Sequence, residues 1–219
     1  MSTPSAADRT RARVGAYPQG MSPERSVEIE KKFDVHEGTP VPDWTQLSAI
    51  ARVSAGEDRH LDAAYLDTAD VALAQEGVAV RRRTGGPDEG WHVKGPLIHG
   101  GRVELAWPLT DDVPDGLREE IAEWTTDPLE PLARIVNDRT VYELLDADGR
   151  VVAEFVDDRV QASDLREGID REWCEWEIEL GPAVPDDIEG FFAEVERVAL
   201  ASGARPASSA SKLARALGQ

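Results

Sequence analysis

Short stretches in which apolar and charged side chains alternate recur along this chain, and they constrain its fold more than any other feature. In residues 27–33, apolar Val27, Ile29 and Phe33 alternate with charged side chains. Successive side chains of a β-strand point to opposite faces, so this spacing predicts a strand with one apolar face and one charged face. The same division recurs around Val80 and in residues 91–94, 101–107, 139–144, 151–158 and 174–180.

The charged faces carry acids and bases on the same strands, and they contain few Ser, Thr, Asn or Gln residues. For any single strand, an antiparallel sheet with one face in water is a sufficient explanation. A sheet closed into a barrel explains the whole set better, because the charged faces would line a lumen in which opposite charges and a ligand compensate one another. We therefore expect an α+β fold, built on a mainly antiparallel closed β-barrel with its apolar faces outside, beneath helices.

Helical spacing of apolar residues predicts the elements that cover the barrel. One helix is expected after the helix-start pair Pro42-Asp43, where Trp44, Leu47 and Ile50 share a face. The polar segment 157–172 is longer than a hairpin turn and is expected to form a loop over one mouth of the barrel. The predicted helices occupy residues 43–53, 117–124, 129–136, 186–201 and 211–217.

Length, charge and cysteine content restrict the class of protein. A chain of 219 residues suits one domain, expected over residues 24–219, after a segment 1–23 without apolar periodicity that is expected to be disordered. The net charge of −19 argues against nucleic-acid binding, which needs a basic footprint. The single cysteine, Cys174, excludes an internal disulfide framework, and no apolar run reaches the ~20 residues that cross a bilayer. We expect a cytoplasmic protein without nucleic-acid or membrane partners, and a homodimer is one of the oligomeric states left open.

Two Glu-x-Glu pairs suggest a metal site. Glu28 and Glu30 lie two residues apart on one strand face, so both can reach one divalent ion or two neighbouring ions. Glu177 and Glu179 repeat this spacing and are the expected partners. Oxygen ligands without His or Cys favour Mg²⁺ or Mn²⁺ over zinc or copper.

Basic residues on the same charged faces supply the opposite charge. Guanidinium groups bind phosphate oxygens in pairs, whereas lysine acts as a point charge. A metal cluster next to such a basic cluster suits a small triphosphate-bearing substrate, whose charge both would stabilise as a phosphoryl bond breaks. The basic residues are Lys32, Arg81, Arg83, Lys94 and Arg139.

The order of several motifs resembles that of a known family. Glu28-Ile29-Glu30-Lys31-Lys32 matches an E-x-E-x-K signature, and Tyr65-Leu66-Asp67-Thr68 is similar to a Y-x-D-T segment. This series resembles the CYTH, or triphosphate tunnel metalloenzyme, superfamily, which includes thiamine triphosphatases, inorganic tripolyphosphatases and class IV adenylate cyclases. The resemblance covers residues 25–217 and continues through residues 77–83, 91–94, 102–104, 137–139, 175–180 and 211–213.

The resemblance implies an eight-stranded antiparallel tunnel with acidic residues on metal and basic residues on triphosphate. The implied catalytic residues are Glu28, Glu30 and Lys32. Glu104 would assist either the metal or the lysines, and Asp158 is preferred to Asp157 as a ligand because it shares a face with Glu154. The implied metal ligands are Glu28, Glu30, Glu104, Asp158, Glu177 and Glu179, and the implied phosphate ligands are Lys32, Arg81, Arg83, Lys94, Arg139 and Lys212.

The expected function is that of a metal-dependent hydrolase that releases phosphate from inorganic tripolyphosphate or an organic triphosphate. One alternative is a class IV-type adenylate cyclase, which would need a purine pocket that the sequence does not reveal. The other is a non-catalytic (poly)phosphate-binding module, against which the two Glu-x-Glu pairs argue. The physiological substrate and the choice between Mg²⁺ and Mn²⁺ stay open.

Overall fold

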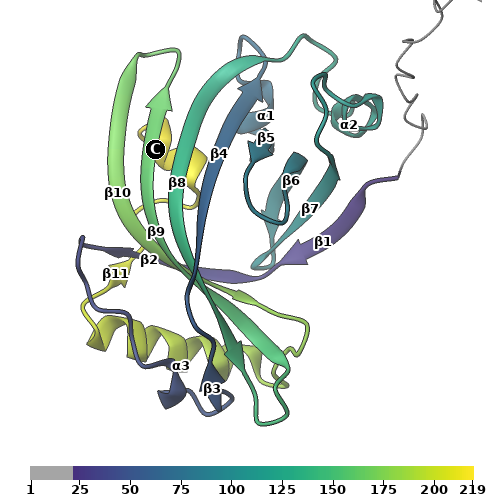
Figure 1. Ribbon diagram of the computed structural model, residues 1–219. Coiled ribbons are helices and arrows are strands. Elements are labelled where there is room, and N and C mark those ends of the chain that lie inside the picture. The colour runs from purple at the N-terminus through teal and green to yellow at the C-terminus, as the bar shows by residue number, and fades with distance from the viewer. Residues whose placement is uncertain (1–21) are drawn as a thin grey trace, which may run out of the picture.

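The computed structural model describes residues 22–219 and contains one antiparallel sheet (Figure 1). The prediction for residues 1–23 therefore falls almost wholly outside the described residues. The hydrogen-bonded order is β1-β7-β6-β5-β4-β8-β9-β10-β2-β11, and β3 pairs with β8. The strands are β1 (Glu24–Glu28), β2 (Glu30–Val35), β3 (Arg52–Val53), β4 (Glu57–Asp67), β5 (Ala79–Thr84), β6 (Gly90–Ile98), β7 (Gly101–Pro108), β8 (Glu130–Leu145), β9 (Val151–Asp164), β10 (Ile169–Leu180) and β11 (Arg205–Pro206).

The expectation of an eight-stranded closed barrel is wrong. The described residues form an eleven-stranded sheet whose hydrogen-bonded order has two ends, at β1 and β11. The physical reason lies at Ile29, where the first predicted strand divides: β1 pairs with β7, whereas β2 pairs with β10. The backbone carbonyl of Ile29 accepts a hydrogen bond from Leu180 N at 3.0 Å. The strands β1 and β2 of this one segment thus pair with strands at different ends of the sheet, and β1 and β2 do not pair with each other to close it.

Helices were predicted with mixed success. Those expected at residues 117–124, 186–201 and 211–217 are confirmed as α2 (Asp115–Ile121), α3 (Ile188–Ala201) and α4 (Lys212–Ala216). A short helix α1 (Ala72–Gln75) was not predicted. The Asp187 side chain caps α3 by accepting a hydrogen bond from Gly190 N at 2.8 Å. Such a cap satisfies a backbone donor that has no partner within the helix.

Two predicted helices and one predicted loop are wrong. Residues 43–53 form only a 3₁₀ turn, Trp44–Gln46, because the chain becomes extended at Leu47 and then pairs as β3. Residues 129–136 belong to β8, where pairing with β4 and β9 on both sides decides the structure. Residues 157–172 are mostly strand, because β9 and β10 continue to a turn of residues 165–168 and satisfy their backbone groups in one long ladder.

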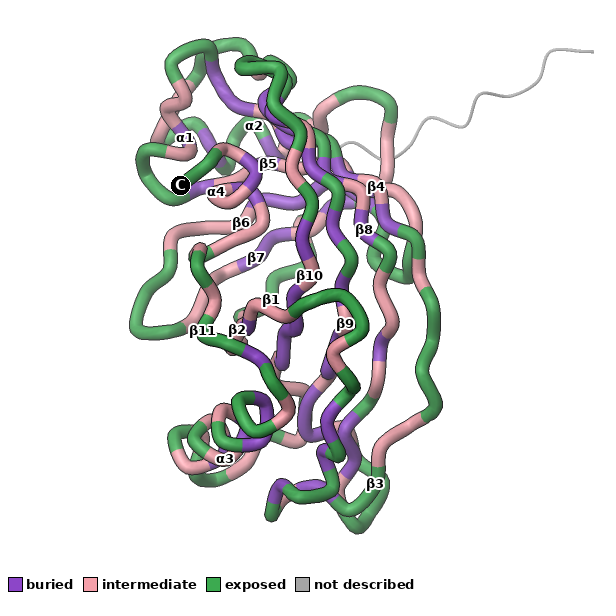
Figure 2. The backbone as a smooth tube through the Cα atoms, turned by 90° about the vertical axis from the view of Figure 1, so that its left-hand side faces the viewer, coloured by how far each residue is buried: buried purple, intermediate pink, exposed green. Residues whose placement is uncertain are grey.

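Apolar packing occurs on both faces of the sheet, as three core clusters. On the outer face, Val195 of α3 packs into one cluster, and Leu117 of α2 packs into another. The third lies on the inner face, where Leu213 and Ala216 of α4 pack against strand residues such as Ile135. Helix α4 therefore closes one end of the space that the sheet surrounds. Buried residues run along the strands, whereas most connecting loops are exposed (Figure 2).

No helix within residues 22–219 is both long and apolar enough to cross a membrane.

Candidate active site

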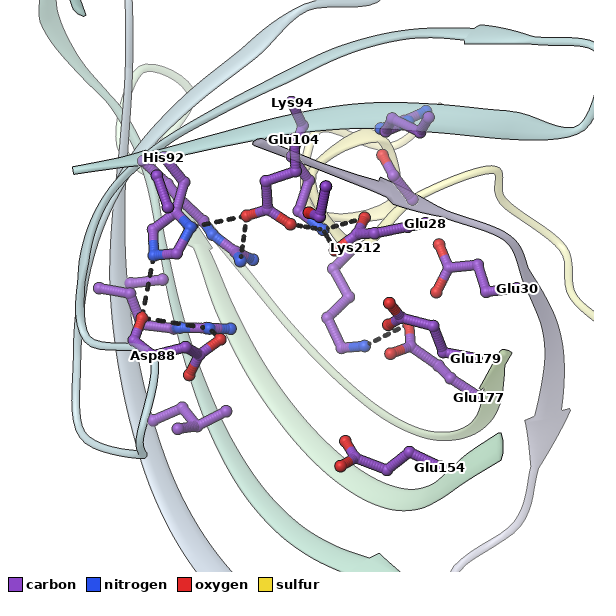
Figure 3. A pocket seen from close by; sticks show the side chains of 18 of the residues that line it. Glu28, Glu30, Asp88, His92, Lys94, Glu104, Glu154, Glu177, Glu179 and Lys212 are labelled. Carbon is purple, nitrogen blue, oxygen red and sulfur yellow. Dashed lines mark hydrogen bonds and ion pairs between the residues drawn. The ribbon is translucent and has the colours of Figure 1, made fainter. Parts of the chain in front are cut away.

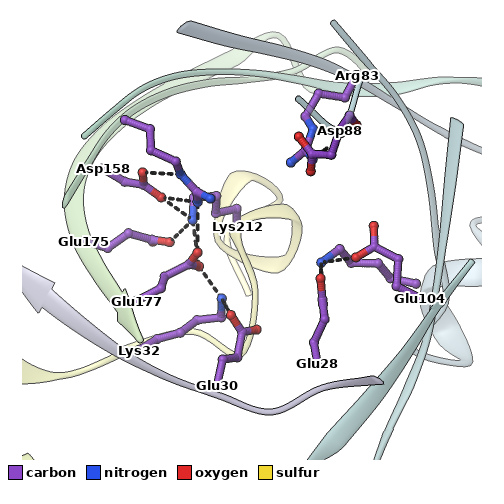
Figure 4. A network of polar contacts seen from close by, with 12 residues as sticks. Glu28, Glu30, Lys32, Arg83, Asp88, Glu104, Asp158, Glu175, Glu177 and Lys212 are labelled. Atoms are coloured by element: carbon purple, nitrogen blue, oxygen red, sulfur yellow. Dashed lines mark hydrogen bonds and ion pairs between the residues drawn. The ribbon is translucent and has the colours of Figure 1, made fainter. Parts of the chain in front are cut away.

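A cavity of about 520 Å³ lies against the inner face of the sheet (Figure 3). It is lined by residues of β1, β2, β4 to β10 and α4, so residues distant in sequence share one space. The strand periodicity explains its charge: Glu177 and Glu179 face the cavity, while Trp176 and Ile178 between them pack into the outer core. Two ion-pair clusters occupy opposite walls (Figure 4).

The first group, here named the Lys212 cluster, consists of Lys212, Arg139, Lys32, Asp158, Glu175 and Glu177. Lys212 Nζ lies 2.9 Å from Asp158 Oδ2, 2.5 Å from Glu175 Oε1 and 2.7 Å from Glu177 Oε1. Arg139 donates to both oxygens of Asp158, at 2.8 and 2.7 Å. Burial disfavours the charge of Lys212, but Asp158 and the two glutamates still raise the pKa of Lys212 well above its usual range. This wall therefore holds its cations and anions as charged partners.

The second group, the Glu104 cluster, consists of Glu104, Arg81, His92, Lys94 and Glu28. Glu104 Oε1 lies 3.1 Å from Arg81 Nη2 and 2.6 Å from His92 Nδ1. Lys94 donates to both oxygens of Glu28, at 2.7 and 2.6 Å, and lies 3.1 Å from Glu104 Oε2. Burial would raise the pKa of Glu104, but Arg81, followed by His92, holds that pKa below its usual range.

Three glutamates form a row across adjacent strands, here named the carboxylate row. Glu179 of β10 is the register partner of both Glu30 on β2 and Glu154 on β9. Directly opposed residues have Cβ atoms roughly 4.5–5.5 Å apart, and like charges in such positions repel. Within the described chain, the Glu179 carboxylate has no hydrogen-bond or ion-pair partner. Glu30 Oε2 lies 2.8 Å from Lys32 Nζ. The row therefore has more negative charge than its neighbours neutralise.

The pKa values of two glutamates reflect this excess. Burial, and then the charge of Glu30, raises the pKa of Glu179 to about 7. Burial, and then the neighbouring Glu104, raises the pKa of Glu28 to about 8, although Lys94 acts in the opposite direction. A bound cation would favour the ionised form of both groups.

Among the described residues, one group of carboxylates has its oxygens close enough together for a metal ion. Asp158, Glu175 and Glu177 each place an oxygen within 4.8 Å of the others, so this buried acidic cluster can bind a metal. Lys212 Nζ already contacts all three carboxylates, so a metal ion there would have to displace it. In the described structure, the carboxylate row and Glu28 do not have their oxygens grouped this closely, but Glu179 has no cation as an ion-pair partner. Carboxylate oxygens in general suit Mg²⁺ or Mn²⁺.

The predicted site residues are brought together around this cavity, although their roles stay predictions. Asp158 does not line the open space: it is fully buried behind Arg139 and Lys212. Asp157 lies on the other face and accepts a hydrogen bond from Trp176 Nε1 at 3.1 Å. The predicted site residues that line the cavity are Glu28, Glu30, Lys32, Arg81, Arg83, Lys94, Glu104, Arg139, Glu177, Glu179 and Lys212.

Several residues of the site were not predicted. Glu154 and Glu175 share strand faces with predicted ligands, so the two-residue period could have indicated them. The sequence did place His92 on the same strand face as Lys94, and buried His92 lines the cavity there, although it was not among the predicted site residues. Asp88 lies in the turn between β5 and β6, and no local pattern places a turn residue against a cavity.

Known proteins share this sequence pattern and fold. The sequence model of the CYTH domain family matches residues 26–215. Two curated relatives, the uncharacterized proteins MT2285 and Rv2226 of Mycobacterium tuberculosis, are 38% identical over 213 residues, which is 90% of this chain. The matched segment spans only 41% of the length of each relative.

Solved structures of low sequence identity have the same fold. A candidate adenylate cyclase of Bacillus halodurans has a TM-score of 0.60 at 16% identity and covers 87% of this chain and 97% of its own. A candidate adenylyl cyclase of Hippeastrum, described as having a dominant triphosphatase activity, has a TM-score of 0.53 at 18% identity, with 88% and 95% covered. The PH1819 protein of Pyrococcus horikoshii has a TM-score of 0.53 at 16% identity, with 87% and 98% covered. The match over residues 26–215 agrees with the motifs and the charged cavity. The chain therefore belongs to the CYTH domain family, a metal-dependent family of triphosphatases and cyclases.

Proposed function

We propose that this protein is a metal-dependent hydrolase that releases phosphate from a small triphosphate. The observation that carries the proposal is the pairing, within one cavity, of an under-neutralised carboxylate row with a set of buried cations. Such a cavity would suit a divalent cation and, beside it, a polyanion. A neutral ligand would match neither the carboxylate row nor the buried cations.

Glu28, Glu30 and Glu179 would hold the metal, with Glu154 as the neighbouring carboxylate. When bound, Mg²⁺ or Mn²⁺ would supply charge neutralisation at phosphate oxygens and polarise them. The glutamates need to be ionised for this, and the raised pKa values of Glu28 and Glu179 mean that metal binding would release protons.

The cations would bind and orient the phosphate chain. Arg81 has a buried Nε without a hydrogen-bond partner in the described structure, which a phosphate oxygen would satisfy. Arg139 presents a fixed guanidinium, because Asp158 holds it from behind at 2.8 and 2.7 Å. Lys94 would exchange carboxylate contacts for phosphate contacts. Catalysis would rest on positioning and charge stabilisation, as is general for phosphoryl transfer.

The cavity lining favours hydrolysis over cyclisation. Among the described lining residues, the only aromatic rings are those of Tyr65 and His92, and both residues are buried. No exposed ring is therefore offered for stacking on a purine. The triphosphatase activity ascribed to the Hippeastrum relative is in line with this proposal.

The test is an assay with tripolyphosphate, thiamine triphosphate and ATP, each with Mg²⁺ or Mn²⁺, in which phosphate, pyrophosphate and cyclic AMP are measured. We expect phosphate from at least one substrate and no cyclic AMP. Glu179→Gln should remove turnover, whereas Glu172→Gln, on an exposed position of the same strand, should not. Binding of triphosphate without phosphate release would favour the non-catalytic module, and release of cyclic AMP with pyrophosphate would favour the cyclase.

A further inference from the structure

One cation of the cavity, Arg83, differs from the others in its partner. Its side chain is only 7% exposed, and its Nε has no hydrogen-bond partner in the described structure. Burial, followed by the charges of Arg81 and Arg139, lowers the pKa of Arg83 to about 9. An anion beside Arg83 would therefore stabilise the charged form of its guanidinium group.

The anion that Arg83 contacts comes from a turn at the edge of the cavity. Asp88 lies in residues 85–89, between β5 and β6, and its carboxylate forms an ion pair with Arg83. Within residues 22–219, this is the one carboxylate at ion-pair distance from Arg83. The Asp88 side chain is 57% exposed, so the carboxylate reaches the buried guanidinium from the solvent side.

The backbone of this turn is held in place. The Asp88 carbonyl accepts hydrogen bonds from His92 Nε2 at 3.0 Å and from Arg83 Nη2 at 3.4 Å. Gly85 has φ +80°, and a Cβ there would lie 2.1 Å from the backbone oxygen of His60. Only glycine fits so close an approach in this conformation. The carboxylate of Asp88 is therefore presented to Arg83 by a fixed turn.

Arg83 also lies at the far end of a series of cations. Lys94 is the register partner of Ala79 on β5, and Arg81 and Arg83 follow at intervals of two residues. Each interval covers roughly 6.4–6.8 Å along a strand. A phosphate chain that extends from the Lys94 end toward Arg83 would meet the Asp88 carboxylate there. Carboxylate and phosphate compete for the same guanidinium donors and repel each other.

We propose that Asp88 is a specificity-determining residue, whose carboxylate takes the position at Arg83 that a further phosphoryl group of a longer chain would need. The inference rests on the proposed function and narrows its substrate class to short polyphosphates. A chain that ends before Arg83 leaves the ion pair intact. A longer chain has to displace Asp88 or leave its last phosphoryl group without a guanidinium partner.

The test compares linear tripolyphosphate with linear tetrapolyphosphate in the wild type, Asp88→Asn and Glu89→Gln. Glu89 is an exposed residue of the same turn, so its variant loses the same charge without a contact to Arg83. Dissociation constants from isothermal titration calorimetry with Mg²⁺, and kcat/KM for phosphate release, are measured for both chains. The tetrapolyphosphate-to-tripolyphosphate affinity ratio should rise about tenfold in Asp88→Asn, the usual effect of one charge-assisted contact, and stay unchanged in Glu89→Gln.

Asp88→Ala, which also removes the hydrogen-bonding group, should raise the ratio in the same direction. A cooperative thermal unfolding transition in each variant shows that the substitution in the turn has left the protein folded. An unchanged ratio in both Asp88 variants, or an equal loss of affinity for both chains, would overturn the role of Asp88 while leaving the proposed function intact. A wild-type protein that binds neither chain would overturn both proposals.

Discussion

Lys94 of β6 donates to both carboxylate oxygens of Glu28 on β1, at 2.7 and 2.6 Å, across the intervening strand β7. A predicted phosphate ligand is thus paired with a predicted metal ligand. A metal ion at Glu28 and the Lys94 ammonium group would compete for the same oxygens. Metal binding and phosphate binding would therefore be coupled, because a metal ion that takes Glu28 would leave Lys94 available for an anion.

Lys94→Gln tests this competition. The variant should bind Mn²⁺ about fivefold more tightly, since one charge interaction in a partly buried site is worth on the order of 1 kcal/mol. Its affinity for tripolyphosphate should fall by a similar factor or more. Calorimetric titration with each ligand measures both changes. Lys31→Gln is the matched control, because Lys31 pairs with Glu196 outside the cavity, at 2.7 Å. Unchanged Mn²⁺ affinity in Lys94→Gln would contradict the competition.

Stability without metal should fall as the pH rises. The pKa values of Glu28 and Glu179 are raised from 4.5 to about 8 and about 7, so the folded state holds protons that the unfolded state releases. Groups with raised pKa values contribute stability below pH ~4.5 that is lost as the pH rises through their folded pKa values. Melting temperatures with a chelator should therefore decline from pH 5 to 8.

Added Mn²⁺ should reverse this trend, because a bound cation favours the ionised glutamates. The stabilisation by Mn²⁺ should grow between pH 6 and 8, measured as the difference in melting temperature with and without the ion. The double variant Glu28→Gln/Glu179→Gln should flatten both curves. A metal-free stability that rises over the same range would show that these glutamates do not carry the buried protons.

The sequence could predict which strand face each site residue occupies, because strand parity needs only neighbouring residues. Glu28, Glu30 and Lys32 line the cavity as their spacing indicates, and so do Arg81 and Arg83. The open sheet could not be predicted, since it depends on the division of one segment at Ile29 between two distant edges.

Long-range pairing also explains the other errors. The spacing of the apolar residues in 129–136 fits a helix or a strand equally well. Backbone pairing with β4 and β9 makes the segment a strand. The carboxylate row needed the register of β2, β10 and β9, which no local pattern contains. Likewise, the position of α4 against the inner face depends on where the chain returns after α3.

Helix α4 should couple stability to phosphate binding. Leu213 is 8% exposed in the inner core cluster and follows Lys212 directly. Leu213→Ala should lower the free energy of unfolding by about 2–3 kcal/mol through the lost burial. It should also weaken tripolyphosphate binding, because Lys212 loses the packing that fixes its helix. Leu200→Ala on α3, where the residue is 41% exposed, should change neither quantity in denaturant titration or calorimetry. Normal binding by a destabilised Leu213→Ala protein would separate the two roles.

Lys212→Met distinguishes the two possible metal positions. Without the ammonium group, Asp158, Glu175 and Glu177 are left with fewer cations, and breaking a buried ion pair costs about 3–5 kcal/mol. The metal-free variant should therefore unfold at lower denaturant concentration than the wild type. Because the three carboxylate oxygens lie within 4.8 Å of one another, Mn²⁺ should occupy the vacated position and restore part of the loss. Titration should then show one more bound Mn²⁺ than in the wild type. An equal number of bound ions in both proteins has two explanations: the metal already displaces Lys212 in the wild type, or this cluster binds no metal. The stability of the variant with Mn²⁺ separates them, because Mn²⁺ stabilises the variant through this cluster only in the first case.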